Sequence, residues 1–159
     1  MLKTETVLRK KAPAFTLHDQ DNEPVSLKDF AGKWVVLYFY PKDDTPGCTT
    51  EACEFTSGIR GFEDLNAVVL GVSKDSPSSH RAFIDKHQLR VRLLSDPDHK
   101  IMEKYGAWGL KHIFGQQAKG TIRSTVLIDP KGYIVKHWPE VTAEGHAEHV
   151  RQALAELQE

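Results

Sequence analysis

An uninterrupted apolar run, WVVLYFY, is the feature that most restricts how this chain can fold. It extends from Trp34 to Tyr40 and contains only aromatic, valine and leucine side chains. A strand with one solvent-exposed face alternates polar and apolar residues. This run does not alternate, so it indicates a strand that is buried on both faces. Pro41 follows directly and ends the strand, because proline has no N–H to donate to a neighbouring strand. The run therefore predicts the central strand of a sheet that is covered on both sides.

Strand and helix patterns alternate through the rest of the 159-residue chain. We expect strands at 14–17, 25–27, 66–72, 91–94, 125–128 and 133–138, and helical segments at 28–30, 45–65, 78–87, 98–105 and 143–157. The glycine-rich segment 106–120 predicts an irregular surface loop. Together these patterns predict an α/β, thioredoxin-like sandwich with a central mixed sheet and an N-terminal β-hairpin extension. No linker or repeat interrupts them, so we expect a single domain over residues 1–159.

Charge and composition exclude several classes of function. The formal net charge is -1 at pH 7, so nothing favours a nucleic acid or an anionic membrane surface as a partner. The N-terminal segment MLKTETVLRKKAPAF lacks the apolar stretch of a secretory signal, and no apolar run approaches membrane-spanning length. We therefore expect a cytoplasmic protein in a reducing compartment. There, a cysteine pair is more often catalytic or metal-binding than structural.

Both cysteines of the chain lie in the short segment YPKDDTPGCTTEACEF. Thr45 and Pro46 form a strong helix-start signal, because threonine favours the N-cap and proline favours the first helical position. Cys48 then falls at the third helical position, where free N–H groups and the positive end of the helix dipole favour a thiolate. Gly47 has no side chain to block the approach, so we expect Cys48 to be accessible at the C-terminal edge of the sheet. The alternative is a small buried cysteine that serves only packing.

Cys53 follows Cys48 by five residues, which is neither the C-x-x-C spacing of a redox motif nor the usual spacing of zinc ligands. Along a helix the two Cα atoms would be roughly 8–9 Å apart, on different faces. A disulfide needs less than about 7 Å, so this pair can be bridged only after local unwinding. The spacing thus indicates a thiol that waits in one conformation and reacts in another. The alternative for Cys53 is a core residue on the inner face of the helix.

The segment YPKDDTPGCTTEACEF resembles the active-site segment of the peroxiredoxins, most closely their bacterioferritin-comigratory or Q-type branch. The family pattern Pro-x-x-x-Thr/Ser-x-x-Cys matches Pro41, Thr45 and Cys48. The resolving cysteine of the branch matches Cys53, and the later arginine of the family matches Arg123 in IRSTVLIDPKGYI. The resemblance also includes KAPAFTL, VVLGVSKDSPSSHRAF and GHAEHVRQALAEL, so it extends over nearly the whole chain.

This resemblance implies a thiol-dependent peroxidase with an antioxidant role in redox homeostasis. In that mechanism the Cys48 thiolate attacks the O–O bond of hydrogen peroxide or an alkyl hydroperoxide and becomes a sulfenic acid. Arg123 would stabilise the thiolate and the developing charge, Thr45 would orient the peroxide, and Pro41 would limit access of water. Glu51, one turn beyond Cys48, could pair with Arg123 and hold its guanidinium.

The resemblance also implies how such an enzyme returns to its reduced state. Cys53 would condense with the Cys48 sulfenic acid to form an intramolecular disulfide, and thioredoxin or a similar dithiol would reduce that disulfide. No metal or organic cofactor is needed. We expect a monomer, with a dimer as the alternative, because this branch is often monomeric and no long exposed apolar stretch stands out.

Two other functions are compatible with the expected fold. A general thiol–disulfide oxidoreductase is the first, although the C-x4-C spacing argues against it. A non-enzymatic interaction or chaperone module is the second. For such a module, Trp108 and Phe114 in the glycine-rich segment would form an apolar docking patch, and otherwise they anchor the surface loop.

Two further residue pairs could suggest other chemistry. His146 and His149 are three residues apart on the last expected helix, which invites a metal interpretation. Exposed surface histidines explain them more simply. Asp43 and Asp44 could be paired acids for hydrolysis, but they more simply form the turn before the helix and add negative charge near its N-terminus.

Overall fold

The computed structural model describes residues 6–113 and 115–159, and its central strand is β4 (Trp34–Phe39). The other strands are β1 (Thr6–Lys11), β2 (Thr16–Asp19), β3 (Pro24–Ser26), β5 (Ala67–Ser73), β6 (Arg92–Ser95), β7 (Trp108–Ile113), β8 (Gln116–Thr121), β9 (Ser124–Ile128) and β10 (Tyr133–Trp138). Eight of them form one sheet in the order β1-β10-β9-β4-β5-β6-β2-β3. β4 pairs in parallel with β5 and antiparallel with β9, which confirms the predicted central mixed sheet.

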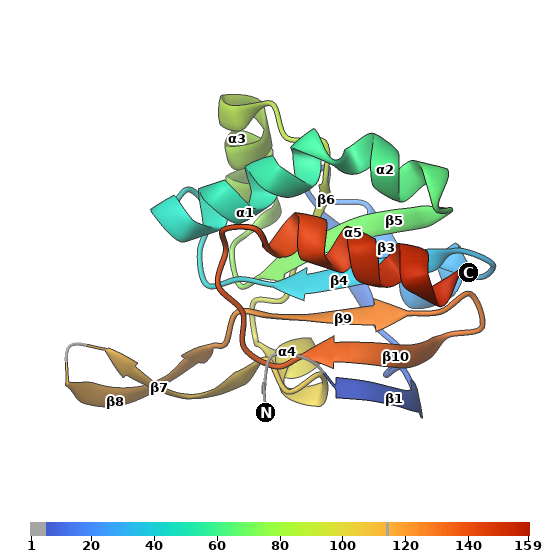
Figure 1. The fold of residues 1–159 in the computed structure, drawn as a ribbon. Helices are drawn as coiled ribbons and strands as arrows, with labels where there is room; N and C mark the ends of the chain where they lie inside the picture. The colour runs from blue at the N-terminus through green and yellow to red at the C-terminus, as the bar shows by residue number, and fades with distance from the viewer. Residues whose placement is uncertain (1–5, 114) are drawn as a thin grey trace.

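Helices cover both faces of this sheet. They are the short 3-10 helix η1 (Leu27–Phe30) and the α-helices α1 (Pro46–Ser57), α2 (Ile59–Asp64), α3 (Pro77–His87), α4 (Lys100–Lys104) and α5 (His146–Leu157). In Figure 1, α1, α2 and α5 lie together over the strands, whereas the hairpin of β7 and β8 projects away from the sheet. No helix in the described parts of the chain has the length and apolar character needed to cross a membrane.

Successive side chains of β4 enter two different cores. Val36 and Tyr38 belong to the cluster that packs against α1, α2, α3 and α5. Val35, Leu37 and Phe39 belong to the cluster on the opposite face, which includes residues of α4 and of the N-terminal hairpin. Because side chains alternate across a strand, a strand between two cores must be apolar at every position. The run WVVLYFY meets this requirement, so the prediction of a strand buried on both faces is confirmed.

Two regions of the chain differ from the expectation. The strand β1 was not predicted, because its sequence TVLRKK is rich in charge; it pairs antiparallel with β10 at the edge of the sheet. Charged side chains are common on edge strands, where they discourage pairing with other chains. The expected loop at 106–120 is wrong, since β7 and β8 pair there as a separate two-stranded sheet. Their glycines, glutamines and lysines give no alternating pattern from which a hairpin could be recognised.

The expected helix at 45–65 is two helices, because the chain leaves the helical ladder at Gly58. Gly58 has φ −95° and ψ 8°, and α2 begins at the next residue. Glycine loses more backbone entropy in a helix than other residues do, so a helix is more easily interrupted at this point. As a result the two cysteines lie in a separate helix of 12 residues that ends before α2.

Gly71 is a glycine that the packing of the sheet requires. It pairs in register with Tyr38 in the neighbouring strand. A Cβ at Gly71 would lie 2.6 Å from Tyr38 Cζ and 2.9 Å from Leu93 Cδ2, both closer than atoms can pack. The tyrosine ring therefore occupies the space that any side chain at Gly71 would need.

We expect Gly71→Ala to lower the free energy of unfolding by about 1–3 kcal/mol, the usual penalty for overpacking a core. Urea unfolding of the variant and of the wild-type protein measures this difference. Gly58→Ala is the matched control, because a Cβ there would be 3.6 Å from its nearest neighbour. Equal stability of Gly71→Ala and the wild-type protein would show that Tyr38 can move away without loss.

Candidate active site

The helix start predicted from Thr45 and Pro46 is present at the end of the central strand. Thr45 is the N-cap with φ −95° and ψ 156°, and Pro46 is the first helical residue, so Cys48 is the third. Thr49 N donates a 2.8 Å hydrogen bond to Thr45 O and closes the first turn. The threonine hydroxyl does not cap the helix. It donates instead to Lys42 O at 2.9 Å, so its oxygen can still act as an acceptor.

Arg123 joins Cys48 to Glu51 across the interface between α1 and the sheet. Arg123 lies one residue before β9, and its Nη2 donates to Cys48 Sγ at 3.3 Å. Its Nη1 donates to Glu51 Oε1 at 2.6 Å. The two terminal nitrogens of the guanidinium therefore contact different residues of the same helix. Three of the residues expected at the site are therefore brought together. A guanidinium beside a sulfur favours the thiolate form through both charge and hydrogen bonding.

The expectation that Cys48 is openly accessible is wrong, because only 1% of this residue is exposed. Its side chain lies in the core cluster with Tyr38 and Tyr40. Gly47 does not keep an open approach either. A Cβ at Gly47 would lie 3.1 Å from Arg123 Nη2, so the missing side chain makes room for the guanidinium rather than for solvent.

Glu51 carries a carboxylate into this core, and its side chain is fully buried. Burial raises the pKa of Glu51 to about 7, although the charge and the hydrogen bond of Arg123 act in the opposite direction. Burial also acts to lower the pKa of Arg123, but the charges of Glu51 and Cys48 outweigh it and the pKa rises above its usual value. Glu51 Oε2 and Tyr38 Oη have no hydrogen-bond partner among the described residues. The site thus combines a fully buried carboxyl group and a partly buried guanidinium with one sulfur.

Cys53 lies near the C-terminal end of the same helix, and both cysteines are free thiols. It is half-buried and lines a cavity of about 470 Å³ between α1 and α5, together with Glu54, Phe62 and Arg151. An uninterrupted helix between Cys48 and Cys53 keeps their Cα atoms roughly 8 Å apart. The structure therefore holds the two sulfurs apart, as the spacing indicates, and gives solvent access to the second one only.

Pro41 lies directly after the buried end of β4 and is half-buried. Its ring has no polar atom with which to bind a substrate. The expected role of Pro41 in limiting water near Cys48 stays a prediction. Arg123 contacts both Cys48 and Glu51. Thr45 lies in the same first turn as Cys48.

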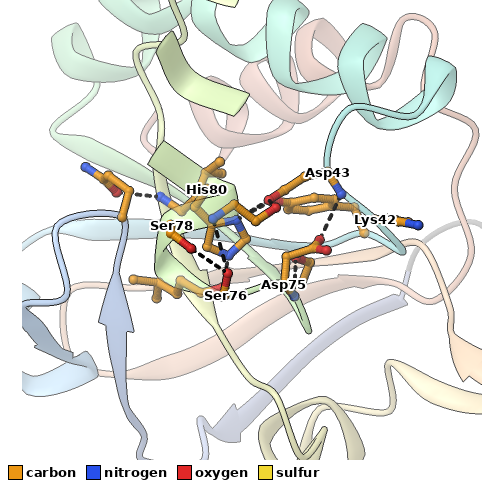
Figure 2. Close-up of polar contacts among 12 residues, drawn as sticks. Lys42, Asp43, Asp75, Ser76, Ser78 and His80 are labelled. Atoms are coloured by element: carbon orange, nitrogen blue, oxygen red, sulfur yellow. Dashed lines mark hydrogen bonds and ion pairs between the residues drawn. The ribbon is translucent and has the colours of Figure 1, made fainter. Parts of the chain in front are cut away.

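A second polar cluster close to the site was missed in the sequence. Asp43 was interpreted as a turn residue, but it is buried and lies 2.7 Å from the Nδ1 of His80 on α3. Figure 2 shows Asp43, Asp75 and His80 turned toward one another from three separate segments. The signal that could have revealed it is a histidine at 80, on the same helix face as the apolar Phe83 and Ile84. In the described residues this is also the group whose ligand atoms are near enough together to hold a metal ion, all within 4.8 Å.

The interpretation of both late histidines as surface residues is correct for His149 and wrong for His146. His149 is exposed, whereas His146 is buried and its Nε2 lies 2.8 Å from Thr125 Oγ1. Burial, with smaller effects from the charges of His149 and Arg123, lowers the pKa of His146 to about 4. His146 is therefore a neutral packing residue at the start of α5.

Trp108 is an anchor rather than part of an open patch. Its ring stacks on His99 with centroids 3.8 Å apart, and it packs against the core cluster below the sheet. Phe114 lies outside the described residues.

Comparisons with known proteins agree with this fold. The model of the AhpC/TSA family matches residues 8–137. Peroxiredoxin Bcp of Bacillus subtilis is 45% identical over 150 residues, which covers 94% of this chain and 96% of that protein. A putative peroxiredoxin bcp of Coxiella burnetii is 48% identical over 141 residues, with 89% and 93% covered.

Solved structures give the same result. The bacterioferritin comigratory protein of Xanthomonas campestris, studied for its alkyl peroxide reduction activity, superposes with a TM-score of 0.87 at 37% identity. That match covers 91% of this chain and 92% of the other. A cysteine mutant of PrxQ from Xylella fastidiosa superposes with a TM-score of 0.88 at 36% identity, and covers 100% and 99%.

The raised pKa of Glu51 predicts how stability depends on pH. The folded state keeps the proton of Glu51 up to about pH 7, whereas the unfolded chain releases it near its ordinary value of 4.5. Between these values the folded state binds more protons, so the contribution of Glu51 to stability is present below pH 4.5 and is lost as the pH rises toward 7. Glu51→Gln should remove this part of the pH dependence.

Chemical denaturation of Glu51→Gln and wild-type protein across this pH range measures the effect. Glu63→Gln is the matched control, because Glu63 is an exposed glutamate on the adjacent α2. Parallel stability curves for Glu51→Gln and wild-type protein would contradict the prediction.

Proposed function

This chain belongs to the AhpC/TSA family and is a peroxiredoxin of the Bcp, or Q-type, branch, and we propose that its peroxidase reaction uses Cys48 to reduce the hydroperoxide and Cys53 to resolve the product. Substrates are hydrogen peroxide and alkyl hydroperoxides. The contact that carries this proposal is the 3.3 Å hydrogen bond from Arg123 Nη2 to Cys48 Sγ, at the third residue of a helix. Charge, hydrogen bonding and the helix terminus all favour a thiolate at that sulfur.

The first step is nucleophilic attack of the Cys48 thiolate on one oxygen of the hydroperoxide. A bond forms between sulfur and that oxygen, the O–O bond breaks, and the leaving oxygen takes a proton to give water or an alcohol. Arg123 donates hydrogen bonds to the oxygens as charge develops on them. Thr45 already uses its own hydrogen on Lys42 O, so its oxygen is free to accept the proton end of the peroxide. These two residues would orient the O–O bond along the line of attack.

Burial of Cys48 also limits which molecules reach it. Only 1% of the residue is exposed, and we propose that a substrate enters beside Arg123 and the first turn of α1. A narrow entry favours small or slender hydroperoxides over bulky disulfides. Exclusion of water strengthens the electrostatic interactions at the sulfur. The arrangement is consistent with a peroxidase and less so with a general disulfide reductase, which needs an exposed thiol.

The second step needs a change of shape. Local unwinding of α1 brings Cys53 to the Cys48 sulfenic acid, a disulfide forms, and the sulfenic oxygen leaves as water. A dithiol, for which we propose thioredoxin, then transfers two electrons to the disulfide and restores both thiols. We propose that the whole chain, 1–159, works as one cytoplasmic domain and as a monomer in this cycle, without a metal or organic cofactor.

Arg123→Ala should slow the reaction with peroxide by roughly 10²-fold or more, as expected when one charged stabiliser is lost. Arg123→Lys should recover only part of the rate, because lysine supplies the charge without the fork that contacts both Cys48 and Glu51. Rapid-mixing measurements with hydrogen peroxide determine these rates. A normal rate in Arg123→Ala would show that the sulfur does not need the guanidinium.

The two cysteines should separate into two steps. Cys48→Ser should abolish peroxide reduction, since a hydroxyl is not a usable nucleophile here. Cys53→Ser should keep the first reaction but lose turnover supported by thioredoxin, and should over-oxidise to the sulfinic acid more readily. Single-turnover and steady-state rates, with mass spectrometry of the product, distinguish these outcomes.

These assays, together with a measurement of protein-disulfide reduction, decide between functions. Reduction of a protein disulfide without peroxide turnover would indicate a thiol–disulfide oxidoreductase, and neither activity would leave an interaction module. A Cys53→Ser variant that keeps both peroxide rates would mean that an outside thiol resolves Cys48. In that case Cys53 would be a packing residue.

A further inference from the structure

A buried polar cluster lies directly before the helix that carries Cys48. Its centre is Asp43, in the loop between β4 and α1, and His80, on α3. The side chain of His80 is fully buried, and that of Asp43 is only 4% exposed. In Figure 2 the two side chains point toward each other across the gap between the loop and α3. Neither residue takes part in the chemistry proposed above.

Every polar atom in this pair has a defined partner. Asp43 Oδ1 accepts a 2.5 Å hydrogen bond from the hydroxyl of Tyr40, and its Oδ2 accepts one of 2.8 Å from Ser79. His80 Nε2 lies 3.0 Å from the carbonyl oxygen of Leu94, which can only accept, so this nitrogen carries a hydrogen. A proton between His80 Nδ1 and Asp43 Oδ2 completes the pair at 2.7 Å. The cluster is therefore fully satisfied, and such networks fix one arrangement of their members.

The cluster holds the loop by its backbone as well as by its side chain. Asp43 N donates a 2.8 Å hydrogen bond to Asp75 Oδ2, which also accepts from a serine at the end of β5. Asp44 follows in the left-handed conformation with φ 61°, and Thr45 is the N-cap of α1. Only these two residues separate the fixed Asp43 from Pro46, the first helical residue, and Cys48 follows in the same turn. The position of the turn is thus set from one side by the pair and from the other by Arg123.

We propose that Asp43 and His80 are positioning residues, which hold the loop before α1 so that Thr45 and Cys48 meet the peroxide in the reactive arrangement. This inference rests on the proposed function of Cys48. His80 is suited to the task because its second nitrogen hydrogen-bonds to β6, so the pair ties the loop to a strand of the sheet.

A purely stabilising role explains this pair less well. Replacing a buried ion pair by packed apolar side chains is often neutral or even favourable for stability, so such a pair is weak evidence of a stabilising function. The pair instead fixes the position of the loop before α1, and this position affects the rate at which Cys48 reacts with peroxide. Misplacement of a reacting group by about 1 Å can slow a reaction by roughly 10²-fold.

A metal ion held by Asp43, Asp75 and His80 is the competing interpretation of the same cluster. The atoms of Asp43 and His80 lie 2.7 Å apart, which is a hydrogen-bond distance. Two ligands of one zinc ion, each about 2.0 Å from it at tetrahedral angles, would lie more than 3 Å apart. The geometry therefore favours a proton between these atoms. Dialysis against a chelator, followed by zinc alone, tests the alternative directly.

The test uses Asp43→Asn and His80→Gln in a Cys53→Ser protein, in which Cys48 is the remaining thiol. Asparagine has nearly the size of Asp43 but places an NH2 donor where the partners are also donors. Glutamine has nearly the size of His80 but loses one of its two hydrogen bonds. Two quantities are measured: the rapid-mixing rate with hydrogen peroxide, and the thiolate absorbance as a function of pH. We expect the rate to fall by roughly tenfold to 10²-fold and the thiolate to appear only at higher pH.

Two control variants separate positioning from general stability. Asp44→Asn changes the neighbouring acid, which is on the surface and pairs with Lys86 and His87, and asparagine tolerates the same left-handed backbone. Tyr105→Phe removes a buried hydroxyl that donates to Pro13 O in the opposite core. Both should keep the peroxide rate and the thiolate titration of the parent protein. Tyr40→Phe, which removes one hydrogen bond to Asp43, gives a milder version of the test if Asp43→Asn or His80→Gln does not fold.

The outcomes separate the two levels of inference. A parent protein that does not react with peroxide at all refutes the proposed function, whereas the thiolate titration still tests the positioning. Folded Asp43→Asn and His80→Gln proteins with unchanged rate and titration overturn the positioning role. Rates that fall only in proportion to stability, in Tyr105→Phe as well, also overturn it. A chelator-dependent loss that zinc reverses assigns the cluster to a metal and rejects the proposal.

Discussion

The guanidinium of Arg123 is the contact on which the arrangement of the site depends. It reaches from the start of β9 to Cys48 Sγ and to Glu51 Oε1, so it ties α1 to the sheet at two points one turn apart. Each partner alone would be an uncompensated group in a dry interior, because Glu51 is fully buried and Cys48 nearly so. Arg123 therefore gives both buried groups a hydrogen-bond donor. The same constraint explains Gly47, whose missing side chain leaves the space that the guanidinium fills.

A second buried pair flanks the same turn of helix from the other side. Asp43 and His80 fix the loop, and Arg123 fixes the helix that follows it. Both pairs join α1 or its loop to elements that belong to the sheet or pack on it. Between them the backbone is free to adopt only a narrow range of positions, which is what preorganisation of a nucleophile requires. Stability alone gives no reason to place two buried polar pairs so near one thiol.

The sequence predicts those parts of the molecule in which local pattern and tertiary environment agree. WVVLYFY is the pattern of a strand between two cores, and Thr45-Pro46 is a strong start signal for the helix that follows it. Arg123 and Glu51 were found through a family resemblance, since no periodicity indicates that residues 72 positions apart will touch. Burial of Cys48 and of His146 could not be read from the chain, because both depend on side chains that arrive from other elements. The β7–β8 hairpin has too few apolar residues for its pattern to be seen.

Gly58 separates the cysteine helix from α2, so α1 has a boundary at each end of its 12 residues. If α1 unwinds when the disulfide forms, the disturbance can stop at Gly58 without reaching β5 and the rest of the sheet. The oxidised molecule would then be a folded protein with one loosened segment on its surface. Proteases and partner proteins recognise loosened segments more readily than folded ones. The redox state of the two sulfur atoms would thus change which proteins can bind or cleave this surface.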